Sequence, residues 1–110
     1  MRTEAQAKNE ELFRNVNDRI ESLSQSVAPR DQTMEYLCEC DRPDCYEKVK
    51  ASREEYESVR ANATHFIVLA GHEDRRVERV TFSNERFLVV EKQGPAARDA
   101  VETNPRNRPS

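Results

Sequence analysis

Residues 38–45 read CECDRPDC, and this cysteine-rich stretch is the most informative part of the 110-residue chain. Its three cysteines, Cys38, Cys40 and Cys45, have the spacing C-x-C-x4-C. In an extended chain, side chains two positions apart point to the same side, so Cys38 and Cys40 can present two thiolates together. Pro43 fixes its own φ and pushes the residue before it out of the helical region. This predicts a turn that brings Cys45 back beside the other two sulfur atoms.

Three neighbouring thiolates predict a metal site that still needs a fourth ligand. Zn²⁺ prefers tetrahedral sets of sulfur and nitrogen ligands, and Cys3His is a common set. The chain has two histidines, His65 and His72. His72 follows Gly71, which lets the backbone turn sharply where a predicted strand ends, whereas His65 lies within that strand. The sequence therefore predicts a zinc ion held by Cys38, Cys40, Cys45 and His72.

Other uses of the three cysteines stay open at this point. They can be free thiols, because a buried cysteine packs as a small apolar side chain. An iron–sulfur cluster with cysteine and histidine ligands is a further alternative to zinc. A disulfide framework is disfavoured, because the number of cysteines is odd and a C-x-C bridge has unfavourable geometry.

The first part of the chain predicts an amphipathic helix over residues 12–27. Apolar side chains recur there at steps of three and four, at Leu12, Phe13, Val16, Ile20, Leu23 and Val27. Pro29 and the polar residues after it predict the end of the helix. The stripe suits a helix docked on its own domain. The alternative is a helix that pairs with a second copy through the same stripe, because the spacing is also compatible with a short coiled coil.

The middle of the chain predicts a hairpin, a short helix and a sheet. Residues 34–40 and 45–51 are the two expected strands of the hairpin, with the cysteines at its tip. Ser52-Arg53-Glu54-Glu55 has the S-x-x-E pattern of a capping box and begins a helix of about three turns. Apolar, β-rich segments predict three further strands, the first of them central in its sheet, at 64–70, 77–82 and 86–92.

These elements together predict a single α+β domain. It consists of an N-terminal amphipathic helix, a Cys-bearing hairpin, a short helix and a small, mainly antiparallel sheet around a zinc site. We expect residues 12–93 to form this domain. Residues 1–11 are expected to be a flexible N-terminus or the start of the helix. The apolar pattern ends after Gly94, so residues 94–110 are predicted to be a disordered tail.

Composition limits the classes of partner and location. The chain has 18 basic and 21 acidic side chains, and its net charge of −3 disfavours binding to nucleic acid. No apolar run approaches the roughly 20 residues that cross a bilayer. Residues 1–11 are charged and contain no apolar signal-peptide stretch. We therefore expect a cytoplasmic protein without a membrane partner.

Several longer patterns accompany the cysteine cluster. They are F-R-x-V-N-x-R-I at Phe13–Ile20, E-Y-E-x-V-R at Glu55–Arg60, F-I-V-L-A-G-H-E at Phe66–Glu73 and V-V-E-K at Val89–Lys92. With them, the chain resembles a group of short, largely uncharacterised actinobacterial proteins that carry the same cysteine cluster and Gly-His step. The resemblance covers residues 12–94 and implies His72 as the fourth ligand. Ala70 stands where the group has Pro before Gly-His, which would loosen that turn.

These residues predict the role of the metal more readily than a reaction. A closed Cys3His set leaves no open coordination position, so the zinc would be structural. We expect a small protein-interaction or regulatory module whose partner is a protein, with a homodimer through the N-terminal helix as one form. A redox-sensing thiol/zinc switch is the alternative. An enzyme is less expected, because no Ser-His-Asp set, glycine-rich phosphate loop or H-E-x-x-H motif occurs.

Overall fold

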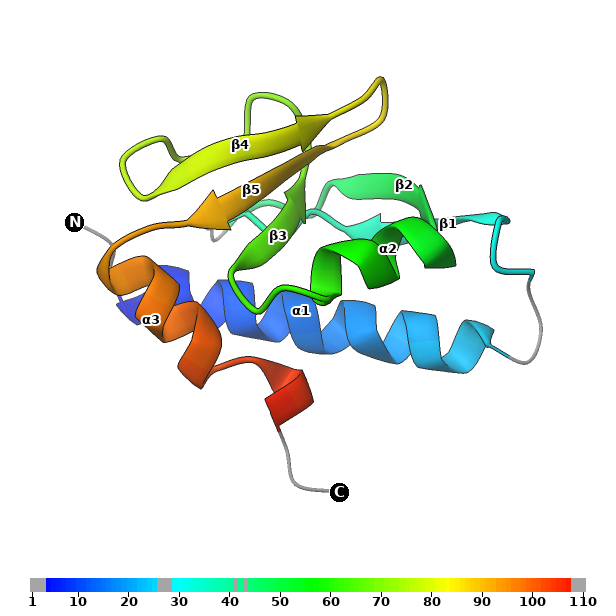
Figure 1. The fold of residues 1–110 in the computed structure, drawn as a ribbon, viewed down its shortest axis with the longest axis horizontal. Coiled ribbons are helices and arrows are strands. Elements are labelled where there is room, and N and C mark those ends of the chain that lie inside the picture. Colours follow the sequence, from blue (N-terminus) through cyan, green and yellow to red (C-terminus); the bar gives the residue numbers. More distant parts are fainter. Residues whose placement is uncertain (1–3, 26–28, 41, 43, 108–110) are drawn as a thin grey trace.

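The computed structural model describes residues 4–25, 29–40, 42 and 44–107, and it has an α+β fold. Helix α1 (Glu4–Ser24) runs along the long axis of the molecule, and the strands and α2 (Arg53–Arg60) lie above it in the view of Figure 1. The elements are α1 (Glu4–Ser24), β1 (Thr33–Leu37), β2 (Lys48–Ser52), α2 (Arg53–Arg60), β3 (His65–Val68), β4 (Glu78–Ser83), β5 (Leu88–Lys92), α3 (Pro95–Glu102) and the short 3₁₀ helix η1 (Pro105–Asn107). The predicted fold class is confirmed.

The predicted hairpin is present, with shorter strands than expected. Strands β1 and β2 pair antiparallel, with Tyr36 opposite Val49. Tyr36, Val49 and Ala51 are buried, while the intervening side chains of β2 are exposed, as the period of two requires. The cysteines lie beyond the paired residues, in the segment that joins the two strands. The hairpin therefore presents them at its tip.

Helix α2 begins at the predicted capping box. The Ser52 side chain accepts from the Glu55 amide at 3.0 Å, and the Glu55 carboxylate accepts from the Ser52 amide at 2.8 Å. Tyr56 and Val59 form the buried apolar face of the helix. The Tyr56 ring stacks on Tyr36 with 4.4 Å between ring centroids. This contact joins α2 to the hairpin.

The second sheet has the order β3-β5-β4, and both of its pairings are antiparallel. The prediction that the segment 64–70 is a central strand is wrong, because β5 is central and β3 is at an edge. The segment is nevertheless apolar because its outer edge is covered. Glu39 N–H donates to the Ile67 carbonyl at 2.8 Å, and Ile67 N–H donates to the Glu39 carboxylate at 3.1 Å. Residues beside the cysteines thus replace a neighbouring strand.

Helix α1 docks on the domain through a polar face rather than through the predicted apolar stripe. Beside Phe13, the buried residues of this face are Glu10, Arg14, Asn17, Glu21 and Ser24. Leu12 is 55% exposed and Leu23 is 66% exposed. Val16 and Ile20 are half-buried, and Val27 lies outside the described residues. The helix packs on its own domain, but hydrogen bonds and ion pairs anchor it.

Arg14 shows how this polar face is held. Its guanidinium donates to the carbonyl oxygens of Ala63 at 2.9 Å and Ala100 at 2.8 Å, and lies 4.3 Å from the centre of the Phe66 ring. Burial, and next the charge of Arg60, lower the pKa of Arg14 to about 10, which leaves it charged at neutral pH. One side chain therefore links α1 to the start of β3 and to α3.

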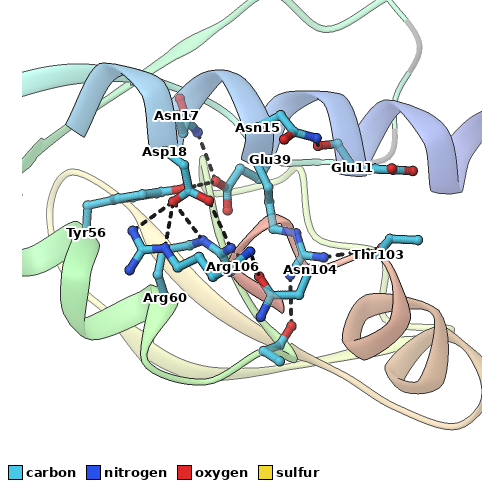
Figure 2. Close-up of polar contacts among 12 residues, drawn as sticks. Glu11, Asn15, Asn17, Asp18, Glu39, Tyr56, Arg60, Thr103, Asn104 and Arg106 are labelled. Carbon is cyan, nitrogen blue, oxygen red and sulfur yellow. Dashed lines mark hydrogen bonds and ion pairs between the residues drawn. The ribbon is translucent and has the colours of Figure 1, made fainter. Parts of the chain in front are cut away.

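The prediction of a disordered tail is wrong for most of residues 94–110. Helix α3 starts at Pro95, a residue suited to the first helical position, and Ala96 and Ala100 are buried. Arg106, in η1, forms an ion pair with Asp18 of α1 (Figure 2). It forms a second ion pair with Glu57. Two small alanines give only a weak apolar pattern in the sequence, and an arginine that forms ion pairs gives none, so this order is not visible in hydropathy. Residues 108–110 lie outside the described part of the chain.

A buried ion cluster holds α1 to the second sheet. The Lys92 ammonium, at the end of β5, donates to the carboxylates of both Glu10 and Glu78, and all three side chains are buried. The ammonium also lies 4.8 Å from the centre of the Phe66 ring. Because two carboxylates share one cation out of contact with water, loss of that cation would leave buried charge without compensation.

We therefore predict that Lys92→Met lowers the free energy of unfolding by about 3–5 kcal/mol, the usual cost of breaking a buried ion pair. Urea denaturation followed by circular dichroism measures this change. Lys48→Met, at an exposed position of β2, is the control and should change stability by no more than about 0.5 kcal/mol. Equal effects of the two substitutions would contradict the assigned role of Lys92.

Candidate metal centre

The structure brings together all four residues predicted as ligands. Cys38, Cys40 and Cys45 come from the β1–β2 segment, and His72 follows the end of β3. Their ligand atoms all lie within 4.8 Å of one another. His65, the other histidine, lies in β3 with its Nε2 3.4 Å from the Glu91 carboxylate, and it is not part of this group. The group could hold a metal ion.

The distances within the cluster match a tetrahedral site. His72 Nδ1 lies 3.5 Å from Cys45 Sγ and 3.7 Å from Cys38 Sγ. In a regular tetrahedron with the usual zinc–sulfur and zinc–nitrogen bond lengths, the sulfur–nitrogen separation is about 3.6 Å. These two separations are therefore consistent with an ion of this size between the side chains. The imidazole turns Nδ1, rather than Nε2, toward the sulfur atoms.

Burial separates this site from an exposed group of thiols. Cys38 is fully buried, Cys40 is 1% exposed and Cys45 is 7% exposed, while His72 is half-buried at the rim. The three cysteines are free thiols rather than partners in a disulfide. Three sulfur atoms and one nitrogen atom supply the four positions of a tetrahedron, so the protein alone can complete the coordination.

The cluster also favours a thiolate. A hydrogen bond with Cys38 lowers the pKa of Cys40 below its ordinary value. Burial opposes this shift, while hydrogen bonds from His72 and from the Arg42 amide act in the same direction. The same interaction with Cys40, together with burial, raises the pKa of Cys38 well above its ordinary value. Because the thiolate is the form that binds a metal, Cys40 is prepared for coordination.

Backbone hydrogen bonds fix the cysteine segment on both sides. Cys38 N–H donates to the Glu47 carbonyl at 3.0 Å, which continues the hairpin ladder by one step. Leu69 N–H donates to Cys38 Sγ at 3.3 Å. An amide that donates to a ligand sulfur offsets part of its negative charge and orients it. The Cys38 sulfur is therefore held by the same stretch of chain that leads to His72.

The turn that carries His72 depends on glycine. Gly71 has φ +90°, a conformation that side-chain-bearing residues rarely adopt, and His72 N–H closes the turn onto the Leu69 carbonyl at 3.0 Å. The Arg42 guanidinium donates to the Gly71 carbonyl at 2.9 Å. Arg42 therefore ties the tip of the hairpin to the histidine turn, although the two are far apart in sequence.

Glu39 is a buried residue of the site region that sequence analysis missed. Its carboxylate accepts hydrogen bonds from Tyr56 Oη at 2.6 Å, Asn17 Nδ2 at 2.9 Å and Ile67 N–H at 3.1 Å. Figure 2 shows Glu39 with Tyr56 and Asn17. Burial raises the pKa of Glu39, against the hydrogen bonds from Tyr56 and Asn17. The signal was the alternation of an extended chain: if Cys38 and Cys40 face the metal, Glu39 must face the core.

Comparisons with known proteins add no assignment. No protein-family model matches the chain, and neither the curated proteins nor the solved structures give a significant match. Among the helices of the described residues, none combines the length and the apolar character needed to cross a membrane. The functional argument therefore rests on the geometry of the site.

The ligand assignment predicts different results for the two histidines. His72→Ala should weaken metal binding by more than about 100-fold, because loss of a ligand costs more than loss of a residue that only orients one. His65→Ala should bind as the wild type does, since its side chain contacts Glu91 instead. Titration with Co²⁺, whose visible spectrum reports tetrahedral thiolate ligation, measures both. Loss of binding in His65→Ala with retention in His72→Ala would overturn the assignment.

Proposed function

We propose that this protein is a small cytoplasmic zinc-binding module in which the ion is structural, and that the module acts by binding another protein. The observation that carries the proposal is the set of four buried or half-buried ligand atoms, three sulfur and one nitrogen, within 4.8 Å of one another. Thiolate and imidazole ligands at tetrahedral spacing are the combination typical of structural zinc.

A structural role follows from what the ion would join. Its ligands come from the tip of the β1–β2 hairpin and from the turn after β3, which belong to two different sheets. With four protein ligands, the ion has no open position for water or substrate, so we propose that it supports the fold rather than a reaction. Metal binding then becomes part of the folding free energy.

The burial of the sulfur atoms supports a structural site over a redox switch. Cysteines that sense oxidants are accessible to them, whereas Cys38, Cys40 and Cys45 are all buried. A cytoplasmic location is part of the proposal, because thiols remain reduced there and are free to bind metal.

The outward face of α1 supports the interaction role. Leu12 and Leu23 are both exposed and eleven residues apart, which places them on the same face of the helix about 16 Å from each other. Large apolar side chains that a domain leaves uncovered are suited to contact with another protein. The partner that we propose first is a second copy of the chain, paired through this face.

The metal proposal predicts the composition and stability of the purified protein. Protein produced without added metal should contain one zinc per chain by elemental analysis. Chelation should lower Tm by about 15 °C or more, because a ligand at about 1,000 times its Kd adds about 4 kcal/mol, and each kcal/mol moves Tm of such a domain by about 4 °C. Cys38→Ser, which lacks a ligand, is the control and should show no such response. A chain that holds no zinc, or holds iron instead, would sink the proposal.

The partner proposal predicts a dimer that depends on α1. Sedimentation equilibrium should find the wild type in a monomer–dimer equilibrium and the double variant Leu12→Ser, Leu23→Ser as a monomer. Both positions are exposed, so zinc content should not change, and Tm should match that of the wild type at concentrations where the wild type is a monomer. Tyr46→Ser, at an exposed position next to Cys45, is the matched control and should still dimerise. A wild type that stays monomeric would exclude the second copy as the partner.

A further inference from the structure

Glu39 lies between two metal ligands, yet its side chain belongs to the core. The carboxylate is fully buried and collects hydrogen bonds from three different elements: Asn17 of α1, Tyr56 of α2 and the Ile67 amide of β3. This carboxylate therefore joins α1, α2 and β3 through hydrogen bonds.

Asn17 connects α1 to the same backbone stretch. Its Nδ2 donates to the Leu37 carbonyl at 2.8 Å as well as to Glu39, and its Oδ1 accepts from Leu37 N–H at 2.7 Å. Both groups of the Leu37 backbone thus pair with a side chain from α1. The position of the middle of α1 depends on the conformation of residues 37–39.

The geometry of an extended chain makes these two sets of contacts inseparable. Cys38 and Cys40 point toward the metal position, and Glu39, between them, points the opposite way into the core. A rotation of the backbone that withdraws either sulfur atom also turns the carboxylate away from its donors. An ion that fixes both sulfur atoms therefore also fixes the carboxylate.

We propose that occupancy of the metal site regulates the docking of α1, with Glu39 as the positioning residue that transmits it. The inference rests on the proposed zinc site and adds a regulated element to it. With the ion bound, Glu39 holds Asn17 and Tyr56. When the ion leaves, the two sulfur atoms lose their common partner, and the three hydrogen bonds alone must order a fully buried carboxylate.

The contacts along α1 indicate which half of the helix responds. The N-terminal half has anchors of its own, because Glu10 pairs with Lys92 and Arg14 donates to Ala63 and Ala100. The half from Asn17 onward contacts the hairpin and Glu39 through Asn17. It is also held by ion pairs of Asp18 with Arg60 and Arg106 and of Glu21 with Arg53. Because only this half contacts residues 37–39, removal of the ion should loosen residues 17–24 from the hairpin more than it loosens the N-terminal half, while the ion pairs of Asp18 and Glu21 stay in place. Strands β3, β5 and β4 should remain paired through their own hydrogen bonds.

Such a release would place the partner surface under metal control. Leu23 lies in the responsive half, whereas Leu12 lies in the anchored half. A partner that contacts both leucines would bind only the metal-loaded form, because only that form holds the helix in one position. Thermodynamic linkage is reciprocal. If metal binding stabilises the hydrogen bonds of Glu39 with Asn17 and Tyr56 by a given factor, these hydrogen bonds raise the metal affinity by the same factor.

Hydrogen exchange followed by mass spectrometry tests this coupling in the full chain. In the zinc-loaded wild type, residues 17–24 should be protected, and chelation should raise their exchange more than that of residues 8–14 or of β5. Glu39→Gln replaces one carboxylate oxygen by an amide that meets the donors of Asn17 and Tyr56. It should bind one zinc about 5-fold or more weakly, with residues 17–24 already exchanging fast when loaded.

Two further variants make the result decisive. Tyr56→Phe removes a single donor and keeps the ring stack on Tyr36, so it should show the same changes to a smaller extent. It provides the test if Glu39→Gln does not fold. Glu35→Gln, at an exposed position of β1, should behave as the wild type.

The outcomes separate this inference from the proposed function. A wild type that binds one zinc but keeps the same exchange at residues 17–24 after chelation would overturn the coupling and leave the metal site intact. Wild-type zinc affinity in both Glu39→Gln and Tyr56→Phe would also overturn it. A wild type that binds no zinc at all would remove the proposed function and, with it, the coupling.

Discussion

The rest of the structure depends on the alternation of side chains across Cys38, Glu39 and Cys40. One side of this short extended segment supplies two sulfur atoms to the candidate metal centre, and the other side supplies a buried carboxylate to the core. The Glu39 backbone also pairs with Ile67 and so covers the outer edge of β3. Three requirements therefore act on the backbone conformation of these three residues.

Helix α1 shows a second consequence of a small apolar core. Apolar residues make up only 35% of the chain, and the helix docks through hydrogen bonds and ion pairs rather than through a broad apolar face. Burying charged groups costs free energy that their partners offset only in good geometry. What the polar contacts add is a unique position, because Arg14 must reach Ala63 and Ala100 while Asn17 reaches Leu37. A helix displaced by one turn would lose these contacts together.

Local rules predicted much of the fold and all four candidate ligands. The capping box at Ser52, the hairpin and the step from Gly71 to His72 each follow from a few neighbouring residues, and the structure contains each of them. The candidate ligands could be predicted from the sequence because ligand chemistry restricts the choice to three cysteines and two histidines. Only the pairing of His65 with Glu91, rather than with the sulfur atoms, had to come from the structure.

The features that sequence did not predict depend on residues distant in the chain. The segment 64–70 has the composition of a central strand, but Glu39 rather than a strand covers its outer edge. The buried face of α1 is polar, so hydrophobic periodicity indicated Leu12 and Leu23 instead. Helix α3 packs through small alanines, which give a weak pattern, and depends on Arg14 from α1. In each case a polar side chain makes the packing contact that sequence patterns assign to an apolar residue or to a neighbouring strand.

The three cysteines are part of the buried core rather than of a separate surface loop. Cys38, Cys40 and Cys45 are part of one buried cluster with Tyr36, Tyr56 and the apolar residues of β3 and β5. A metal site in a separate loop could empty without effect on the remainder, because few contacts would cross between the two. Here the sulfur atoms, the stacked tyrosines and the Glu39 carboxylate share neighbouring positions. The cysteine cluster, the hairpin and helix α1 are for that reason parts of one packed unit.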